Sequence, residues 1–356
     1  MRRDAIRTLA LLVLVAGCGS AAPIRSEEAS VASTPASAPA LSATVVATIP
    51  LAVFPGGPAV TSDALWFWDD TAGSIVRVDV ATDRAVATIP IGDPNATPYG
   101  TPKAITANEQ TVWVSDDVNH AVARIDPATN KIVERIALDK IADPAVARPV
   151  SPFGLALDRE VLWVSDFDQG LVLRIDTKTK RVTLVVSNVD HPEGIAVGLG
   201  SIWVVEHRLG SIARIDPATG KVVATIALPG TGPDPVCGMC VDSVVTSSDG
   251  VWVPLDFGDG VARIDPGTNH VSAEIPLGRV VDSLAVGDRA IWAAGWDGSI
   301  PCTDTGASVT RIDEVTNVAS GSTTVQCAVT VAVTSGALWV GTADAPNGVT
   351  RFDVGP

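Results

Sequence analysis

The chain has 356 residues, of which 46% are hydrophobic and 18% are charged, so it can bury a large core. Forty Asp and Glu against 25 Lys and Arg give a net charge of −15, and such an acidic surface repels phosphate and disfavours nucleic-acid binding. Four His and five Cys leave little material for a His-rich metal centre.

The first seventeen residues have the character of a signal peptide. Arginines at positions 2, 3 and 7 precede an apolar run at 9–15 that is too short to span a membrane. The run ends in Val15-Ala16-Gly17-Cys18, which resembles the lipobox of bacterial lipoproteins. That resemblance implies removal of residues 1–17, lipidation of Cys18, and a membrane-anchored protein on the outer face of the cell membrane or in the periplasm.

Residues 18–44 are expected to form a tether that starts at the lipidated cysteine. Of the 26 residues at 19–44, 19 are Ala, Ser, Pro or Thr. Such a segment cannot bury a core, so we expect it to be disordered and to hold the following domain away from the membrane.

A repeated unit then fills residues 45–356. A tryptophan recurs at 66, 113, 163, 203, 252, 292 and 339, and an Arg-x-Asp element follows each one. Each unit has alternating β-rich runs separated by turn residues, here named strands a to d, with the Trp in strand b and Arg-x-Asp in strand c. This pattern predicts one all-β domain, a seven-bladed β-propeller.

The last unit ends after strand c, because the chain stops soon after Asp353. The run at 45–51 closely matches strand d of the fourth unit at 222–228. We therefore expect the N-terminal strand to complete the last blade, which removes the open edges of an unclosed ring.

The repeats resemble known propellers. Leu/Ile-Trp-Val-x-Asp/Glu followed by Arg-Ile-Asp-Pro-Ala-Thr-Gly/Asn-Lys is similar to the bacterial YVTN-type repeats and to the streptogramin (virginiamycin B) lyase-like propellers. The resemblance implies this fold, and for the lyases it implies active-site His residues just before the small residue of strand a, with Glu and Mg²⁺ nearby. The corresponding residues here, none of which is His, are Lys103, Phe153, Glu193, Asp242, Asp282 and Val329.

Residues that every repeat shares are interpreted as structural. The blade tryptophans are expected to pack between adjacent sheets. The Asp-Pro-Ala-Thr stretches are expected to be c–d turns, in which the Asp accepts backbone N–H groups.

Insertions distinguish the repeats, and they all fall on one face. The lengthened segments are the d–a connections at 92–101, 139–152 and 229–241 and the b–c loop at 296–308. In an antiparallel blade these loops share one rim, which we interpret as the surface that binds an unknown protein or small molecule. Neutral drift in tolerant loops is the alternative. Contact candidates on this rim are Phe257, Trp296, Asp297 and the long d–a loops.

The same rim is acidic, and the residues that define it are Asp69, Asp116, Asp166, Glu206, Asp242 and Asp282. A ring of carboxylates could hold Ca²⁺ or Mg²⁺ or a cationic ligand. Alternatively, the acids three residues after the Trp cap the b–c turns through backbone N–H groups, and this structural interpretation is the one we favour. We therefore expect no cofactor, with Ca²⁺ or Mg²⁺ as the alternative.

One cluster in the fourth unit could carry chemistry. Two imidazoles and two carboxylates could converge there, from His191, Glu193, Glu206 and His207. Such a set could act in general acid–base catalysis or hold a metal ion.

Four cysteines remain after Cys18, an even number in an exported protein. Cys302 and Cys327 fall in adjoining loops of one rim, so we expect them to pair, with Cys237 and Cys240 as a local bridge. A redox pair or a zinc site at Cys237 and Cys240 is the alternative.

The sequence as a whole favours a membrane-anchored, extracytoplasmic propeller, expected to be a monomer, that binds a ligand or protein through its acidic rim without catalysis. A metal-assisted lyase or hydrolase of the streptogramin lyase-like type is the alternative.

Overall fold

The computed structural model describes residues 38–51, 55–69, 73–91, 103–138, 149–230, 243–255, 260–296, 306–343 and 347–354. They belong to one compact unit that spans residues 35–356. The expected signal peptide, Cys18 and most of the expected tether lie outside the described residues. Among the residues that are described there is no helix, and so none with the length and apolarity to cross a membrane.

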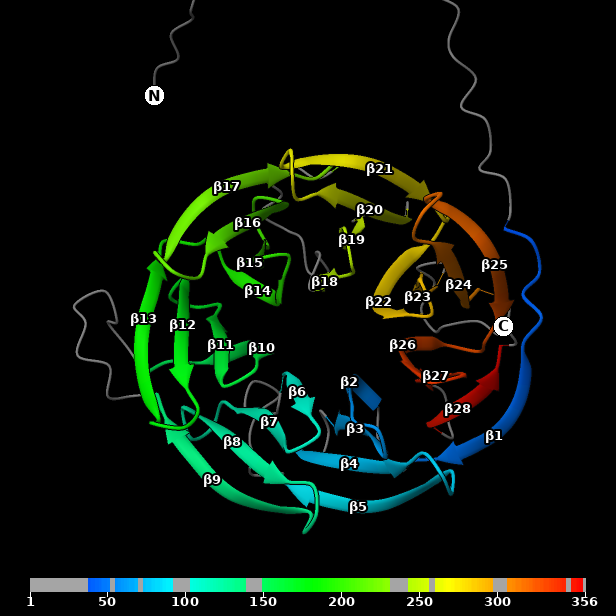
Figure 1. Ribbon diagram of the computed structural model, residues 1–356. Helices are drawn as coiled ribbons and strands as arrows, with labels where there is room; N and C mark the ends of the chain where they lie inside the picture. Colours follow the sequence, from blue (N-terminus) through cyan, green and yellow to red (C-terminus); the bar gives the residue numbers. More distant parts are fainter. Residues whose placement is uncertain are drawn as a thin grey trace, which may run out of the picture. The chain divides into compact units, whose positions relative to one another are not determined.

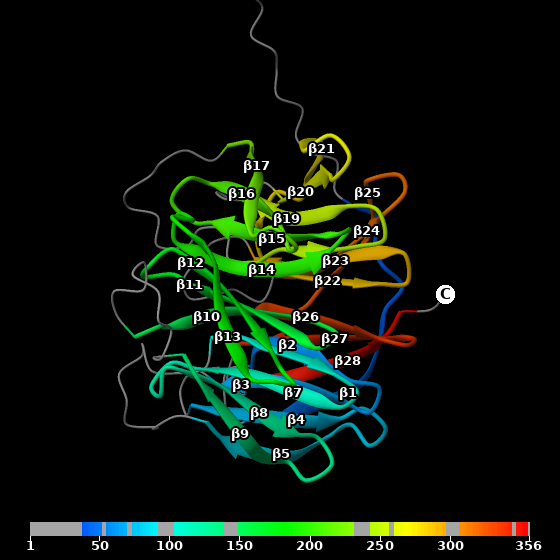
Figure 2. The same ribbon diagram turned by 60° about the vertical axis from the view of Figure 1, so that its left-hand side comes forward.

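Seven four-stranded antiparallel sheets make up the fold, and they follow one another around a ring (Figures 1 and 2). Blade 1 contains β2 (Pro55–Val60), β3 (Ala64–Asp69), β4 (Ser74–Asp79) and β5 (Arg84–Pro90). Blade 2 contains β6 (Ile105–Asn108), β7 (Thr111–Asp116), β8 (Ala121–Asp126) and β9 (Lys131–Ala137). Blade 3 contains β10 (Pro152–Asp158), β11 (Val161–Asp166), β12 (Leu171–Asp176) and β13 (Arg181–Ser187). Blade 4 contains β14 (Pro192–Gly198), β15 (Ser201–Glu206), β16 (Ser211–Asp216) and β17 (Lys221–Ala227). Blade 5 contains β18 (Val245–Thr246), β19 (Val251–Leu255), β20 (Gly260–Asp265) and β21 (His270–Pro276). Blade 6 contains β22 (Val280–Gly287), β23 (Ala290–Trp296), β24 (Ser308–Asp313) and β25 (Val318–Thr324). Blade 7 contains β26 (Ala328–Thr334), β27 (Ala337–Thr342), β28 (Gly348–Asp353) and β1 (Thr44–Pro50).

The ring closes as the sequence predicts. In blade 7 the strand order is β1-β28-β27-β26, so the first strand of the described chain supplies the outer strand of the last blade. Thr44 pairs with Asp353 and Pro50 with Gly348, and β1 and β28 lie side by side in Figure 1. The prediction of a seven-bladed propeller completed by its N-terminal strand is confirmed.

The core lies between the blades. Each of seven hydrophobic clusters joins two neighbouring sheets, and the blade tryptophans are buried in them. Trp203 of blade 4, for example, packs with Val251 and Val253 of blade 5. The repeated Trp is therefore a packing residue, because burying an indole between sheets contributes more apolar contact than any other side chain.

Repeated arginines tie some blades together at the c–d turns. The Arg77 guanidinium lies 5.0 Å from the centre of the Trp66 ring and donates to Pro127 O and Asn130 Oδ1 in blade 2. Arg214 makes the same contacts to Pro266 O and Asn269 Oδ1 in blade 5. A guanidinium that stacks and donates in this way links a sheet to the turn of the next sheet.

Blade 7 has no c–d turn, because its strand d comes from the other end of the chain. In its place, residues that precede β1 run along the outer strand of blade 6. Leu41 N donates to Ser322 O at 2.7 Å, and Ser322 N donates to Pro39 O at 2.8 Å. We expected the tether to extend to residue 44, but residues 39–41 are held on β25, so the folded region begins before residue 45.

Candidate functional site

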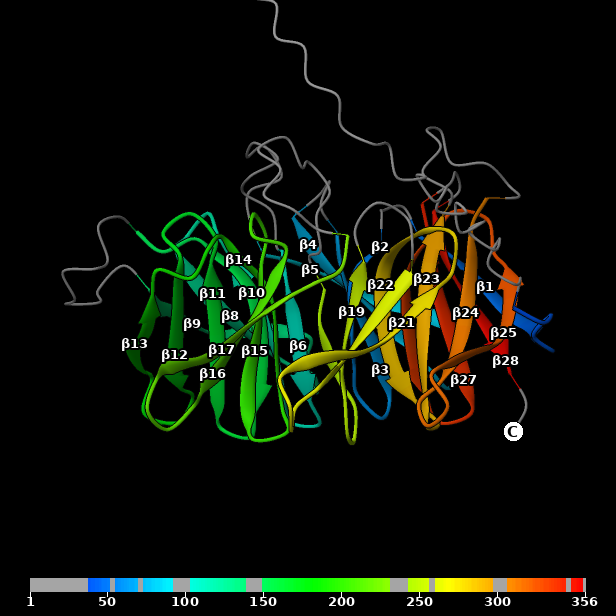
Figure 3. The ribbon, with the colours of Figure 1, turned by 90° about the horizontal axis from the view of Figure 1, so that it is seen from above.

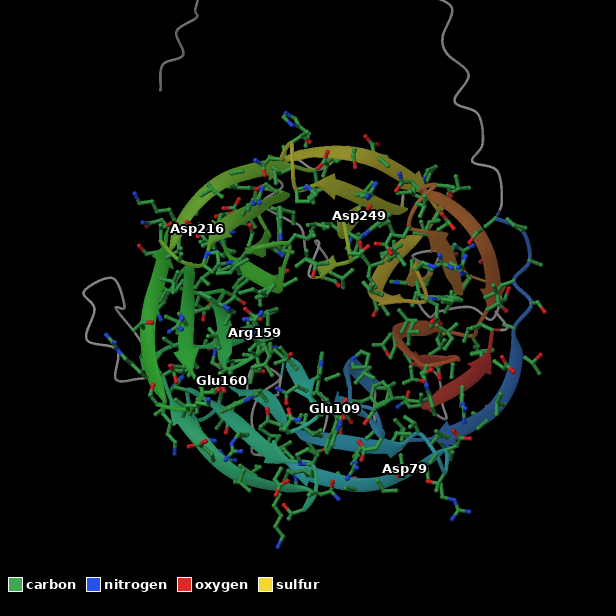
Figure 4. The ribbon with its side chains drawn as sticks, in the orientation of Figure 1. Asp79, Glu109, Arg159, Glu160, Asp216 and Asp249 are labelled. Atoms are coloured by element: carbon green, nitrogen blue, oxygen red, sulfur yellow. The ribbon has the colours of Figure 1, made fainter. Side chains whose placement is uncertain are left out.

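The two faces of the ring carry different turns. The a–b and c–d turns share the lower face in Figure 3, and Figure 4 labels Asp79, Asp216, Glu109, Glu160 and Asp249 on them. Each c–d turn has the expected form.

At Asp216, for example, Oδ1 accepts the Ala218 N–H at 2.9 Å and Oδ2 accepts the Thr219 hydroxyl at 2.7 Å. These hydrogen bonds hold the pKa of the Asp216 carboxyl below its usual value, since they favour the ionised form.

On the opposite face, the acids three residues after the blade Trp are buried within turns rather than displayed in an open ring. Asp69, Asp116, Asp166 and Glu206 are 0–6% exposed. Asp116 Oδ2 receives Arg135 Nε at 2.6 Å and Asp116 Oδ1 receives Asn119 Nδ2 at 2.8 Å. Asp116 Oδ1 also accepts the Asn119 backbone N–H at 3.3 Å, which is the contact expected of a carboxylate that caps the b–c turn.

Asp166 shows the cost of such a position. Its Oδ1 accepts the backbone N–H of Asp168, and its Oδ2 accepts the Gln169 side-chain amide at 2.8 Å. Burial nevertheless raises the pKa of the Asp166 carboxyl, since loss of water outweighs the hydrogen bonds from Gln169 and Ser151. Within the described part of the chain, no three His, Cys, Asp or Glu side chains are grouped so as to hold a metal ion.

A β-bulge lies at the start of strand a in blades 3 and 4. In blade 4, Pro192 pairs with Glu206 and Ile195 with Val204, so one extra residue is accommodated around Glu193. Blade 3 has the same bulge between Pro152 and Leu155. A bulge re-aims the side chains at the bulged positions, here Phe153 and Glu193.

Four rings meet where blade 3 adjoins blade 4, and we call Phe153, Phe167, His191 and His207 the aromatic–imidazole platform. The Phe153 and Phe167 rings stack with centroids 5.7 Å apart and an interplanar angle of 29°. The His191 and His207 rings stand nearly perpendicular to Phe167, at centroid distances of 4.9 and 5.5 Å. All four side chains are half-buried.

A carboxylate lies beside each imidazole, and only the His191 pair has hydrogen-bond geometry. His191 Nδ1 lies 3.1 Å from Asp190 Oδ1, and His207 Nδ1 lies 2.9 Å from Glu193 Oε2. Glu206 is the fifth polar member: it accepts the Ser211 hydroxyl at 2.8 Å and the Asp190 N–H at 3.5 Å. The structure therefore brings the four predicted cluster residues together.

Two small residues position Glu193 from the neighbouring blade. Gly154 N donates to Ser165 Oγ at 2.8 Å, and Ser165 Oγ donates to Glu193 O at 2.7 Å. A Cβ at position 154 would collide with that carbonyl oxygen, so only glycine allows the two strands to approach this closely. The platform is thus fixed by the backbone as well as by its side chains.

The other predicted rim residues are dispersed. Asp282 lies in β22 and Trp296 ends β23, both in blade 6. Cys327 is buried directly before β26. The remaining candidates lie outside the described residues, so their roles stay predictions: Cys18, Cys237, Cys240, Asp242, Phe257, Asp297 and Cys302.

Sequence reasoning did not single out Phe167, although it is the ring that every other member of the platform contacts. A signal was present. In the position four residues after the blade Trp, blades 1 to 5 carry Asp70, Asp117, Phe167, His207 and Asp256, so a Phe interrupts an otherwise polar series.

Comparison with known proteins identifies the fold alone. No protein-family model matches the chain, and no curated protein matches it in sequence. Its structure is similar to one entitled "Streptogramin B lyase structure", with a TM-score of 0.66 and 14% identity over 88% of this chain and 98% of that chain. It is also similar to "Structure of U3-55K", with a TM-score of 0.66 and 10% identity over 87% and 98% of the two chains. A third similar structure is "Kuenenia stuttgartiensis Hydrazine Synthase", with a TM-score of 0.66 and 13% identity over 85% and 96%. The expected resemblance to the streptogramin lyase-like propellers is confirmed as a likeness of fold.

Proposed function

We propose that the protein is an exported, lipid-anchored propeller that binds a ligand or protein through its insertion-bearing rim, without catalysis, and that the aromatic–imidazole platform is the centre of that binding surface. One observation carries the proposal: three half-buried rings, Phe153 of blade 3 and His191 and His207 of blade 4, all contact a fourth ring, Phe167. Exposed or half-exposed aromatic clusters on a rigid scaffold are typical of binding sites.

A ligand screen tests this function. The mature chain in detergent is melted in the presence of small molecules and peptides, beside the variant Phe167→Ser. A ligand that raises the Tm of the wild type and leaves that of Phe167→Ser unchanged supports the proposal. Ligands that stabilise both proteins equally, or none at all, would count against a binding role for the platform.

Membrane attachment forms a separate part of the proposal, through lipidation of Cys18 and the following tether. Metabolic labelling with a radioactive fatty acid should mark the wild type and not Cys18→Ser, and the variant should leave the membrane fraction. Equal labelling of the wild type and of Cys18→Ser would show that Cys18 is not the lipidated residue.

We also propose the disulfides Cys302–Cys327 and Cys237–Cys240, because the buried position of Cys327 beside a long loop suits a bridge that fixes the rim. Peptide mapping without reduction should recover both linkages from secreted protein.

A second candidate, a lyase or hydrolase, is favoured by a specific contact. An imidazole beside a carboxylate, as His207 Nδ1 is beside Glu193 Oε2 at 2.9 Å, brings a base and an acidic group together, although this pair lacks the angle of a hydrogen bond. Within the described ranges no three His, Cys, Asp or Glu side chains are placed so as to hold Ca²⁺ or Mg²⁺, so this candidate rests on His207 and Glu193.

Calorimetric titration separates the two candidates. Saturable binding of Ca²⁺ or Mg²⁺ that is lost in the variant Glu206→Gln/His207→Ala would favour the enzyme. Turnover of a ligand found in the screen, lost in His207→Gln, would do so directly.

A further inference from the structure

The polar atoms that the platform offers to a ligand are acceptors. A carboxylate only accepts hydrogen bonds, and its oxygen repels a lone pair on a nearby ring nitrogen. We therefore assign the proton of the neutral His191 imidazole to Nδ1, which faces Asp190 Oδ1 at 3.1 Å. His207 Nδ1 lies 2.9 Å from Glu193 Oε2, but this pair lacks hydrogen-bond geometry. The Nε2 of His191 then carries the lone pair and accepts hydrogen bonds, as do the carboxylate oxygens of Asp190 and Glu193.

The rings themselves attract a cation. Lys103 Nζ already lies 5.8 Å from the centre of the Phe153 ring, so one cation is seated on this platform by the chain itself. Elsewhere the same fold places a guanidinium over an indole four times, at 4.9–5.5 Å, in the pairs Arg77–Trp66, Arg214–Trp203, Arg263–Trp252 and Arg351–Trp339. Aromatic faces attract cations through their quadrupole.

The local charge points the same way. Asp190, Glu193 and Glu206 surround the two imidazoles, and Asp166 lies one residue before Phe167. Lys103 offsets one of these charges. The chain as a whole carries −15, so an approaching anion is repelled and a cation is attracted.

We infer that the aromatic–imidazole platform of blades 3 and 4 binds a guanidinium group, carried by an arginine side chain of a partner polypeptide or by a small guanidino compound. This inference rests on the proposed binding function and names the chemistry of its ligand. A guanidinium is planar, stacks on aromatic faces, and has five N–H donors and no acceptor, so it complements a site of flat rings and acceptor atoms. An ammonium is a compact and strongly hydrated charge that matches the rings less well.

Three matched probes test the charge and the shape. N-acetyl-L-arginine amide, its lysine analogue and its citrulline analogue are titrated into the mature chain by NMR at neutral pH. Citrulline keeps the planar head but lacks the charge. We expect saturable arginine binding, with citrulline at least tenfold weaker and lysine several-fold weaker. Equal binding of arginine and citrulline, or no arginine binding, would overturn the inference.

Variants locate the site. Phe167→Leu keeps an apolar side chain without the ring and should weaken arginine binding at least fivefold. Glu193→Gln removes one carboxylate and should also weaken it. Glu160→Gln is the matched control, because it makes the same charge change on an exposed turn of the opposite face (Figure 4). Melting curves confirm that each variant is folded. Unchanged affinity in a folded Phe167→Leu protein would place the binding elsewhere.

Two further comparisons identify the source of the group and separate the two hypotheses. A Gly-Arg-Gly peptide amide that binds more tightly than the single residue supports a polypeptide partner, whereas equal affinity supports a small guanidino compound. If the ligand screen finds a platform ligand and every guanidinium probe fails, the guanidinium inference is wrong and the binding function stands. If neither binds, both are wrong.

Discussion

The two faces of the ring use the same residue type in opposite ways. On the c–d face, Asp carboxyls cap exposed turns, and hydrogen bonds hold the pKa below its usual value in Asp176, Asp216, Asp265 and Asp313. On the face of the b–c loops, Asp166 is buried and its pKa is raised. The repeated c–d turns stabilise the fold. On the face of the b–c loops, where the repeat is interrupted, polar and aromatic groups are buried at a cost in stability. Such a cost is typical of functional surfaces.

The largest expected loss of stability follows from removing a repeated tryptophan. Trp203 is fully buried between blades 4 and 5, and its indole N–H donates to Gly198 O at 3.1 Å. Trp203→Ala should lower the free energy of unfolding by about 3–5 kcal/mol, because it leaves a cavity between two sheets. Chemical denaturation of the wild type and of Trp203→Ala measures this difference in unfolding free energy.

Trp296 is the comparison for that variant, since it stands outside the repeat and is half-buried. Trp296→Ala should cost less than half as much. An equal loss of unfolding free energy in Trp203→Ala and Trp296→Ala would show that repeated and non-repeated tryptophans contribute equally to stability.

A repeated arginine should matter less than a repeated tryptophan, and its effect should depend on the blade. Arg214→Met removes charged hydrogen bonds to Pro266 O and Asn269 Oδ1 of the next blade. The expected loss is about 2 kcal/mol. Arg311 of blade 6 has no c–d turn of blade 7 to reach, and its guanidinium donates to Ser320 of its own blade. Arg311→Met should therefore cost less in the same denaturation experiment, and the reverse order would contradict the blade-to-blade role.

The segment before β1 should give a smaller effect. A chain that starts at residue 44 loses the two backbone hydrogen bonds between residues 39–41 and Ser322. We expect it to be less stable than a chain that starts at residue 38 by about 1–3 kcal/mol. Hydrogen exchange should show faster exchange of the β25 amides in the shorter chain. Identical exchange would mean that this segment does not stabilise the closure of the ring.

These comparisons also show what the sequence could predict. The seven Trp and Arg-x-Asp positions determine the blades because they repeat, and β1 is recognisable because its sequence copies β17. The meeting of His191, Glu193, Glu206 and His207 was predictable from their loop positions. The role of Phe167 was not predictable, because its neighbours come from three separate segments. Some of these neighbours lie at β-bulges, whose geometry cannot be predicted from residue spacing. Residues 39–41 were assigned to the tether because nothing in an Ala- and Pro-rich stretch specifies pairing with Ser322.

The smallest expected effect concerns acid and tests the contrast between the two faces directly. Because the folded-state pKa of Asp176 is lowered, its contribution is present above the unfolded-state pKa and is lost as the pH falls through the folded-state pKa. The stability difference between wild type and Asp176→Asn should therefore shrink on acidification.

For Asp166 the sign is reversed, since a raised folded-state pKa means that the native state binds the proton more tightly. Wild type should therefore gain stability relative to Asp166→Asn as the pH falls from neutrality through the raised pKa towards the unfolded value. Urea denaturation of the three proteins between pH 7 and pH 3 measures both trends. If the two differences move in the same direction, the carboxyls of the two faces do not differ in the way their surroundings require. Opposite trends would mean that the buried Asp166 carboxylate, one residue before the central ring of the platform, lowers the stability of the fold at neutral pH. The exposed Asp176 carboxylate of the c–d face would then raise it.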